Sequence, residues 1–598
     1  MRPSNYGHSD RPTNSADPIG GVPTGEVHHD PRQYQQPHRG GEPVPSTPAR
    51  SRHPGDHPGQ HPNAAGTPPR VLILAVLLGL VLSSCASPDS ETGRSFSYAI
   101  LEPTHLTPGR ETSIQGLYVL DALFDTLTRT DPKGRVANDE AESITSPDRR
   151  TWTIRIKPGL SFHNGEPVTA ASYVDAWNTA AYGPNGWVNG FYFAHIDGFE
   201  AMNPPDPDGG GPKSAPPPSA DRLAGLKVLD RRTFQVRLTA PFSQFPTTLA
   251  FVGFAPLPRA ALANIRQFDR APIGNGPFRI EGQWENNRQI KLRRYPGYRG
   301  IRPARSDGLT FKIYATWETG FTDLRAGRVD VMRSIPAPLI PQARRVSGGR
   351  IRSIPSSTME YLEFPLYDKR FQNQDLRKAI SMAIDRQGIV NGVYDGAYRP
   401  TGTILAPIIP GFRPNACGET CTYQPDKARE LLRRAGGWQG PLQLSVAGND
   451  STDRQWMIDV ANQLRQNLGI TDVRVRAIPQ ASYLGLLGDR KMSGPYRATW
   501  IMDYPSAENY LTFRCTPDNR QGYNGAACRD LLAQGNRAPS PNKAVPYYQR
   551  AEDILLADLP VLPLWNQQDT IAYSKRLSNV NTDPYVAPHV RLDEVTVK

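Results

Sequence analysis

The sequence lacks the features that most enzyme and membrane-protein classes require. Its 598 residues include only five cysteines, and the longest apolar run covers twelve residues, Val71 to Leu82. A membrane-spanning helix needs about twenty. The chain has no His-Glu-x-x-His metal motif, no Gly-x-Ser-x-Gly nucleophile motif and no Gly-x-x-x-x-Gly-Lys phosphate loop. We therefore expect a protein that is not an enzyme and holds no cofactor and no metal.

The apolar run ends in Leu82-Ser83-Ser84-Cys85, which resembles a bacterial lipobox, where a signal peptide is cut before a cysteine that then carries lipid. Arg70 supplies the positive charge that precedes the apolar part of a signal peptide. A buried helix with an ordinary free cysteine is the alternative, but a helix without a polar face has little to pack against here. We predict a lipoprotein signal peptide at 71–84 and lipid attachment at Cys85, on the outer face of the cytoplasmic membrane.

Residues 1–70 hold fourteen prolines and seven of the eleven histidines, with no apolar run. Such a segment cannot bury enough surface to offset its conformational entropy, so we predict a disordered extension. Weak metal binding by the histidines is the alternative. Their irregular spacing favours a solvated tail.

The net charge of +12 and the pI near 9.4 belong almost entirely to the part after residue 84, because residues 1–84 carry seven arginines against six acidic residues. Lysine and arginine are dispersed there, and an exported protein seldom meets nucleic acid, so an anionic membrane surface or acidic ligands are the expected partners. The exported part, Cys85 to Lys598, is too long for one hydrophobic core. We expect two or three domains.

Four cysteines follow Cys85 in an oxidising compartment, where disulfides form. They allow three pairings, and proximity favours Cys417 with Cys421 and Cys515 with Cys528. A zinc site is the alternative. It lacks Cys-x-x-Cys spacing and any neighbouring histidine.

The periodicity of apolar residues indicates a mixture of strands and helices. Strand alternation recurs at 96–100, 152–156, 234–238 and 309–313, and helical spacing recurs at 376–384 and 428–435. A strand at 442–446, a helix at 457–468 and a strand at 473–475 read as a β-α-β unit. Parallel sheets built from such units bind ligands beyond the carboxyl ends of their strands.

Several motifs, in this order, resemble the peptide-binding family (family 5) of ABC-transporter solute-binding proteins, which includes dipeptide- and oligopeptide-binding lipoproteins. They span most of residues 95 to 570. The motifs are Ser146-Pro147-Asp148, Trp152-Thr153-Ile154, Lys157-Pro158-Gly159, Phe162-His163-Asn164-Gly165, Val168-Thr169-Ala170, Pro272-Ile273-Gly274-Asn275-Gly276-Pro277-Phe278, Gly327-Arg328-Val329-Asp330, Leu376-Arg377-Lys378-Ala379, Ala383-Ile384-Asp385-Arg386 and Pro425-Asp426-Lys427-Ala428.

The resemblance implies an α/β, periplasmic-binding-protein-like fold with two lobes, a hinge of two chain crossings, a ligand engulfed between the lobes and an extra domain inserted in the first lobe. The expected ranges are 86–130 and 266–345 for the first lobe, 131–265 for the extra domain, 346–570 for the second lobe and 571–598 for a C-terminal return to the first lobe.

The resemblance also points to Trp500-Ile501-Met502-Asp503-Tyr504-Pro505. Residues 496–501 read as a strand, so Asp503 stands just past its carboxyl end. In the peptide-binding relatives the matching aspartate accepts the ligand's α-ammonium group, and the backbone near the matching tryptophan pairs with the peptide as an added strand. The alternative for Asp503 is a turn residue. For Trp500 and Tyr504 the alternative to ligand contact is packing in the hydrophobic core.

Three further residues are candidates for the cleft. Met359 and Tyr361 lie in a segment that resembles the first strand after the hinge, and His105 follows the first strand, where a structural role is equally expected. The residue that binds the ligand's carboxylate is an arginine or lysine that spacing does not identify.

We therefore predict a monomeric, lipid-anchored receptor that captures peptides and delivers them to a membrane permease and an ATPase on separate chains. The fold does not fix the cargo, so an oligosaccharide, a nickel chelate, haem or a signalling peptide are alternatives. An exported enzyme and a purely structural envelope lipoprotein are more distant ones.

Overall fold

The computed structural model describes residues 94–204, 216–448, 451–516, 519–587 and 589–598. The predicted tail (1–70), the signal peptide (71–84) and Cys85 lie outside them. Residues 89–598 form one compact unit, and everything below concerns that unit.

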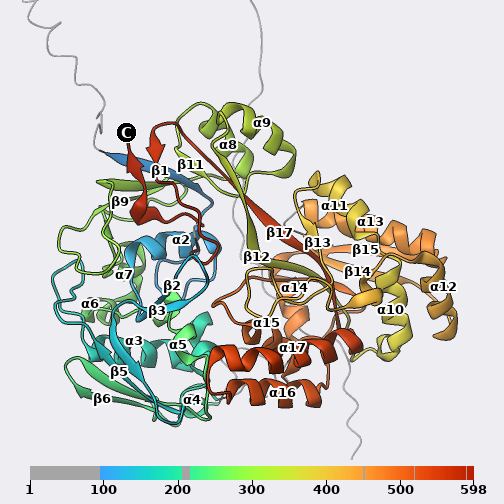
Figure 1. Cartoon of the computed structure of the whole chain (residues 1–598), viewed down its shortest axis with the longest axis horizontal. Coiled ribbons are helices and arrows are strands. Elements are labelled where there is room, and N and C mark those ends of the chain that lie inside the picture. The colour runs from blue at the N-terminus through green and yellow to red at the C-terminus, as the bar shows by residue number, and fades with distance from the viewer. Residues whose placement is uncertain (1–93, 205–215, 449–450, 517–518, 588) are drawn as a thin grey trace, which may run out of the picture. The chain divides into compact units, whose positions relative to one another are not determined.

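The framework is a sheet of eleven strands that extends through both halves of the unit (Figure 1). Ten strands lie in the order β15 (Val473–Ile478), β14 (Leu442–Ala447), β16 (Tyr496–Trp500), β12 (Ile351–Glu363), β17 (Val561–Tyr573), β11 (Val331–Met332), β1 (Ser95–Ile100), β10 (Gly308–Ile313), β9 (Gln289–Arg294) and β8 (Phe278–Ile280), and β13 (Arg399–Pro400) pairs with β17. The predicted alternation at 96–100 forms β1, which is buried on both faces because it is central to the first half of the sheet.

Two long antiparallel strands, β12 and β17, connect the two halves. At one end β17 pairs with β11 of the first lobe, through Met332 and Ala572. At the other end β12 pairs with β16 of the second lobe, beginning at Met359 and Trp500. Figure 1 shows both strands running between the two groups of helices. They are the two chain crossings that the resemblance implies.

The ladder between these strands shifts register twice, between Pro355 and Met359 and again between Glu360 and Tyr361, and the first interruption is the longer one. Pro355 faces Gln568 and Met359 faces Asn566, so three residues of β12, 356–358, stand opposite one residue of β17. The Asn566 side-chain amide donates to the carbonyls of Ser356 (2.8 Å) and Thr358 (3.0 Å). This is a β-bulge, which bends a strand locally, and it lies between the two lobes.

The first lobe carries the helices and short strands that surround β1 and β10. They are α2 (Ile114–Leu123), the hairpin β2 (Thr128–Thr130) and β3 (Val136–Asn138), α5 (Phe245–Thr248), α6 (Arg259–Ala263), α7 (Ile265–Arg270), α8 (Trp317–Arg325), α9 (Ile340–Val346) and the C-terminal pair β18 (Leu577–Ser578) and β19 (Thr596–Val597). Leu577, Val590 and Leu592 are buried in the same core as Tyr98, so the C-terminal residues pack against the first lobe.

The predicted extra domain, 131–265, contains a sheet of its own. The sheet consists of β4 (Ala141–Thr145), β5 (Thr151–Ile156), β7 (Thr233–Arg237) and β6 (Leu226–Asp230). The same range holds α3 (Ala170–Ala181) and α4 (Phe199–Met202) and also includes β3, α5 and α6, which lie beside the first lobe's own elements. The core is not separate, because Trp177 and Phe234 of this segment belong to the same hydrophobic cluster as Tyr98 and Phe311. The segment is therefore packed as an extension of the first lobe.

Two of the sequence motifs contact each other inside the first lobe. The His163 ring accepts the N–H of Gly274 at Nδ1 (3.1 Å) and donates from Nε2 to the carbonyl of Gly276 (3.1 Å). Burial lowers the pKa of His163 to about 4, so the ring is neutral and can fill both roles. A Cβ on Gly274 would lie 1.9 Å from the Leu123 carbonyl oxygen, which only glycine avoids. These motifs hold the scaffold together.

The second lobe covers its half of the sheet with helices. They are α10 (Gln374–Met382), α11 (Arg386–Tyr394), α12 (Pro425–Arg434), α13 (Ser451–Leu468), α14 (Gln480–Gly488), α15 (Ala507–Cys515), α16 (Ala526–Asn536) and α17 (Pro541–Asp558). Strands β14 and β15 are parallel and joined by α13, which confirms the predicted β-α-β unit. Short 3-10 turns occur at Gly183–Asn185, Val188–Phe193, Val252–Phe254, Ala337–Leu339, Lys369–Gln372, Gly418–Cys421 and Leu592–Glu594.

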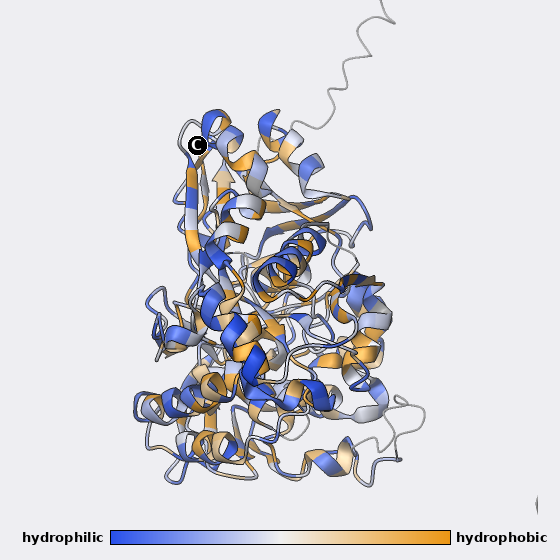
Figure 2. Ribbon diagram, turned by 90° about the vertical axis from the view of Figure 1, so that its right-hand side faces the viewer, coloured by the Kyte–Doolittle hydropathy of each residue, from blue (hydrophilic) through white to orange (hydrophobic). Residues whose placement is uncertain are grey.

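Both favoured disulfides are present, Cys417–Cys421 and Cys515–Cys528, with Cα atoms 5.7 and 5.6 Å apart. In the described ranges no helix is long and apolar enough to cross a membrane. Figure 2 shows polar and apolar residues mixed along the helices and strands.

Candidate functional site

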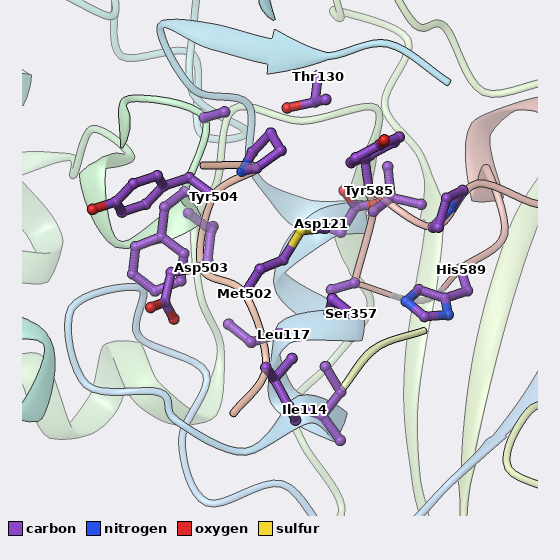
Figure 3. Close-up of a pocket in the computed structure, with 18 of the residues that line it drawn as sticks. Ile114, Leu117, Asp121, Thr130, Ser357, Met502, Asp503, Tyr504, Tyr585 and His589 are labelled. Atoms are coloured by element: carbon purple, nitrogen blue, oxygen red, sulfur yellow. The ribbon is translucent and has the colours of Figure 1, made fainter. Parts of the chain in front are cut away.

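A pocket lies between the two lobes, with about 1180 Å³ of space free of protein atoms and partly open to solvent. The first lobe contributes residues of α2 and β2, residues 250–252, Arg333 and, from the C-terminal segment, residues 584–587 and His589. The second lobe contributes Ser357 and residues 501–505. Figure 3 shows Asp503 and Tyr504 on one side of the pocket and Tyr585 and His589 on the other. The residues after β16 thus reach the crevice beyond the carboxyl end of that strand.

Asp503 is held by Asn509 of helix α15. The Asn509 amide donates to Asp503 Oδ2 (2.9 Å), and its oxygen accepts the Asp503 N–H (3.1 Å) and the Trp500 indole N–H (3.1 Å). The helix begins at Ala507, with Ser506 capping it through the N–H of Glu508 (3.2 Å). A rigid helix therefore fixes the direction of the carboxylate.

The Asp503 carboxylate has no cationic partner among the described residues. Its hydrogen bonds come from the neutral donors Asn509 and Tyr192. Burial raises its pKa to about 6, and these two donors hold the pKa lower than burial alone would. A buried carboxylate without a counter-ion is costly, so a ligand that brings a positive charge would gain from binding here.

Tyr504 also lines the pocket. Its hydroxyl donates to Glu508 Oε2 (2.6 Å), and the Thr512 hydroxyl donates to Glu508 Oε1 (2.6 Å). Trp500 is half-buried and packs on Phe513, with ring centroids 4.4 Å apart, and it is not among the pocket-lining residues.

Met359 and Tyr361 do not line this pocket. Both are fully buried in the core of the second lobe, and the Tyr361 hydroxyl donates to the carbonyl of Ile404 (2.6 Å). Strand β12 lies between β16 and β17, so its side chains are covered by the helices of the lobe. The pocket-lining residue of β12 is Ser357, in the bulge.

His105 lies outside the pocket as well. Its Nδ1 is 2.7 Å from Asp269 Oδ2, and Asp269 also accepts from the N–H of Leu106 (2.9 Å) and the hydroxyl of Thr107 (2.7 Å). This arrangement fastens the loop after β1 to helix α7.

Sequence reasoning missed the part of the pocket that the C-terminal segment contributes. Arg333 binds Asp569 through two hydrogen bonds of 2.9 Å and donates to the carbonyl of Ala587 (2.9 Å). Arg333 and His589 hold the pKa of Asp569 well below its usual range, and burial lowers the pKa of His589. No motif or spacing marks these residues, because segments far apart in the chain bring them together.

The lobes contact each other around the pocket. The N–H of Ser243 donates to the carbonyl of Asn536 (2.8 Å), and the Tyr585 hydroxyl donates to the carbonyl of Ile408 (2.7 Å). The rings of Phe191 and Phe513 also meet across the cleft, with centroids 5.8 Å apart. These contacts join the two lobes in this structure.

Residues 135–522, more than half of the chain, match the model of bacterial extracellular solute-binding proteins, family 5 (middle part). The probable deoxycholate-binding periplasmic protein of Escherichia coli K12 is 27% identical over 78% of this chain and 86% of its own. The oligopeptide-binding protein of Bacillus subtilis 168 is 24% identical over 85% of this chain and 96% of its own. The solved structure of the Escherichia coli murein tripeptide-binding protein has a TM-score of 0.70 and 21% identity, over 85% of this chain and 99% of that one. That similarity shows the fold.

Proposed function

Because the chain belongs to the bacterial extracellular solute-binding proteins of family 5, we propose that it captures peptides with a free amino terminus in the cleft between its lobes. The observation that carries the proposal is Asp503, a half-buried carboxylate in the cleft whose described partners are all neutral. The oligopeptide-binding and murein tripeptide-binding relatives support the choice of ligand.

The chemistry of the pair explains why an ammonium group suits this position. An ammonium offers three N–H donors and one positive charge, and the pair is strengthened by the low dielectric of a closed cleft. Asp503 accepts side-chain hydrogen bonds from Asn509 and Tyr192, and a carboxylate can accept about four, which leaves acceptor capacity for the ligand. Removing one partner of such a buried pair costs about 2–5 kcal/mol.

We further propose that Cys85 carries the lipid anchor, that the receptor acts as a monomer outside the cytoplasmic membrane, and that it passes its ligand to a permease and an ATPase on other chains. The lipobox-like tetrapeptide that ends in Cys85 and the absence of a phosphate-binding loop from the sequence support these points. Globomycin, which blocks removal of lipoprotein signal peptides, should cause the uncleaved precursor to accumulate. A Cys85→Ser variant should be released from membranes.

Titration calorimetry with tri- to pentapeptides that have free or acetylated amino termini tests the peptide proposal. We expect binding of the free-amine peptides only, and loss of that binding in Asp503→Asn, which keeps the size of the side chain. Asp269→Asn, which removes a carboxylate outside the pocket, is the matched control. Equal binding of peptides with free and with acetylated amino termini would show that Asp503 is a turn residue and does not bind the ligand. Absence of binding would favour another solute, such as a bile acid, an oligosaccharide or a metal chelate.

A further inference from the structure

The pocket contains three basic side chains among its described lining residues: Arg129, Arg333 and His589. A peptide with free ends carries a carboxylate as well as an ammonium, so one of these groups is the natural partner of that second charge. Their hydrogen bonds within the protein decide which one has capacity for a ligand.

Arg333 and His589 already bind other groups of the protein. Arg333 forms a bidentate ion pair with Asp569, in which Nε donates to Oδ1 and Nη2 donates to Oδ2, each at 2.9 Å. The His589 Nδ1 lies 3.0 Å from the same carboxylate, and burial lowers the pKa of His589, which favours the neutral ring. A ligand carboxylate approaching this group would meet a cation that is already neutralised.

Arg129 is different. It lies on β2, and its Nη2 donates to Asp121 Oδ1 at 3.4 Å, near the outer limit for a hydrogen bond. Its Nε is buried without a hydrogen-bond partner. A guanidinium has five N–H donors in a planar fork that matches a carboxylate, so most of the binding capacity of Arg129 is unused.

The neighbours of Arg129 neutralise it only in part. Asp121 is shared with a second arginine, since its Oδ2 lies 3.6 Å from Arg302 Nη1. Arg302 is itself bound tightly by Asp125, at 2.6 Å. Asp139 and Asp593 also act on Arg129, but burial raises the pKa of both carboxyls, and the pKa of Asp139 reaches about 7, which keeps much of it protonated at neutral pH. The side chain of Arg129 is 15% exposed, so solvent and ligand can reach it.

We propose that Arg129 binds the carboxylate of the ligand, so that the ligand is a short zwitterionic peptide. The inference rests on the proposed function. Arg129 belongs to the first lobe and Asp503 to the second, and both line the same pocket. A peptide that pairs with both residues bridges the lobes, and its two charged ends hold the cleft closed.

The test compares tri-, tetra- and pentaalanine, as free acids and as C-terminal amides, by titration calorimetry at pH 7. The purified protein should bind at least one free acid about tenfold or more tightly than its amide. In Arg129→Gln the free-acid affinity should fall to that of the amide, while the amide affinity stays the same. Arg129→Lys should keep part of the preference for free acids over amides, because lysine keeps the positive charge but lacks the planar set of N–H donors that binds both carboxylate oxygens.

Arg135, in the turn after β2, is exposed, pairs with Asp131 and does not line the pocket, so Arg135→Gln is the control for the loss of one positive charge. Equal binding of acids and amides by the unchanged protein would overturn the inference. An equal loss for both forms in Arg129→Gln would overturn it too, because it would show a structural role. If acetylated amino termini or Asp503→Asn leave binding unchanged, or if no alanine peptide binds, the proposed function itself fails.

Discussion

Asn509 holds Asp503 through both ends of its amide, because its nitrogen donates to the Asp503 carboxylate (2.9 Å) and its oxygen accepts the Asp503 N–H (3.1 Å). The same oxygen accepts the Trp500 indole N–H (3.1 Å). One side chain thus orients the carboxylate, the backbone that carries it and the neighbouring ring.

Peptide affinity should depend on the ionisation of Asp503, whose pKa burial raises to about 6. An ammonium binds the ionised carboxylate, so affinity should fall about tenfold per pH unit below 6 and be constant above it, until the ligand amine loses its proton near pH 8. Asn509→Ala removes a donor that lowers this pKa, so the loss should begin at higher pH. Calorimetry from pH 5 to 8 measures this. A profile identical in both proteins would contradict the role of Asn509.

Glu140 should make the fold less stable as the pH rises. Burial and the charge of Asp125 raise its pKa to about 8, from 4.5. The folded state therefore holds this proton more tightly than the unfolded state, and the free energy of unfolding should fall between pH 4.5 and 8, by up to about 1.4 kcal/mol per pH unit.

Glu140→Gln should flatten part of that decline. Asp139, Glu360 and Asp503, whose pKa values are raised to about 7, 7 and 6, contribute to the remainder. Urea unfolding at pH 5 and pH 8 is the measurement. Glu142→Gln, on the exposed part of the neighbouring strand, should leave the decline intact. An unchanged decline in Glu140→Gln would show that this carboxyl is already ionised in the folded protein over this pH range.

The Tyr585 hydroxyl should favour the closed cleft, since it donates to the carbonyl of Ile408 in the other lobe (2.7 Å). Tyr585→Phe removes only this bond, worth about 1 kcal/mol, so peptide affinity should fall about fivefold. X-ray scattering should show a larger radius of gyration without ligand. Tyr295→Phe removes a similar bond within the first lobe, to the carbonyl of Phe162 (2.9 Å), and should change neither quantity. Unchanged scattering in Tyr585→Phe would refute the expectation.

The two disulfides should differ in their contribution to stability, because they close loops of different length. Cys515–Cys528 has a sequence separation of 13, and chain entropy gives about 3 kcal/mol for such a loop. Cys417–Cys421 has a separation of 4, which gives about 2 kcal/mol. Paired serine substitutions and urea unfolding compare them. A larger loss at 417 and 421 would show that strain or local packing outweighs loop length.

Local patterns were sufficient to predict much of the fold. Alternation located β5 and β10, and helical spacing located α10 and α12, because each depends on residues close in the chain. Asp503 was placed correctly past the end of β16 for the same reason. Whether it binds ligand stays a prediction.

The rest depends on contacts between distant segments. Met359 and Tyr361 were expected in the cleft, but strand β12 pairs with residues of β16 and β17 that lie far along the chain, and this pairing buries both side chains. Arg129 and Tyr585 reach the pocket only because β2 and the C-terminal segment meet there. No periodicity within either segment contains that information.

The bulge at 356–358 has a mechanical consequence. The ladder is regular from Ile351 to Pro355 and shifts register once more between Glu360 and Tyr361, so residues 356–358 are the longest stretch of β12 between the lobes without paired residues in β17. We therefore expect bending between the lobes to be easiest in this stretch, because no ladder hydrogen bonds stiffen β12 there.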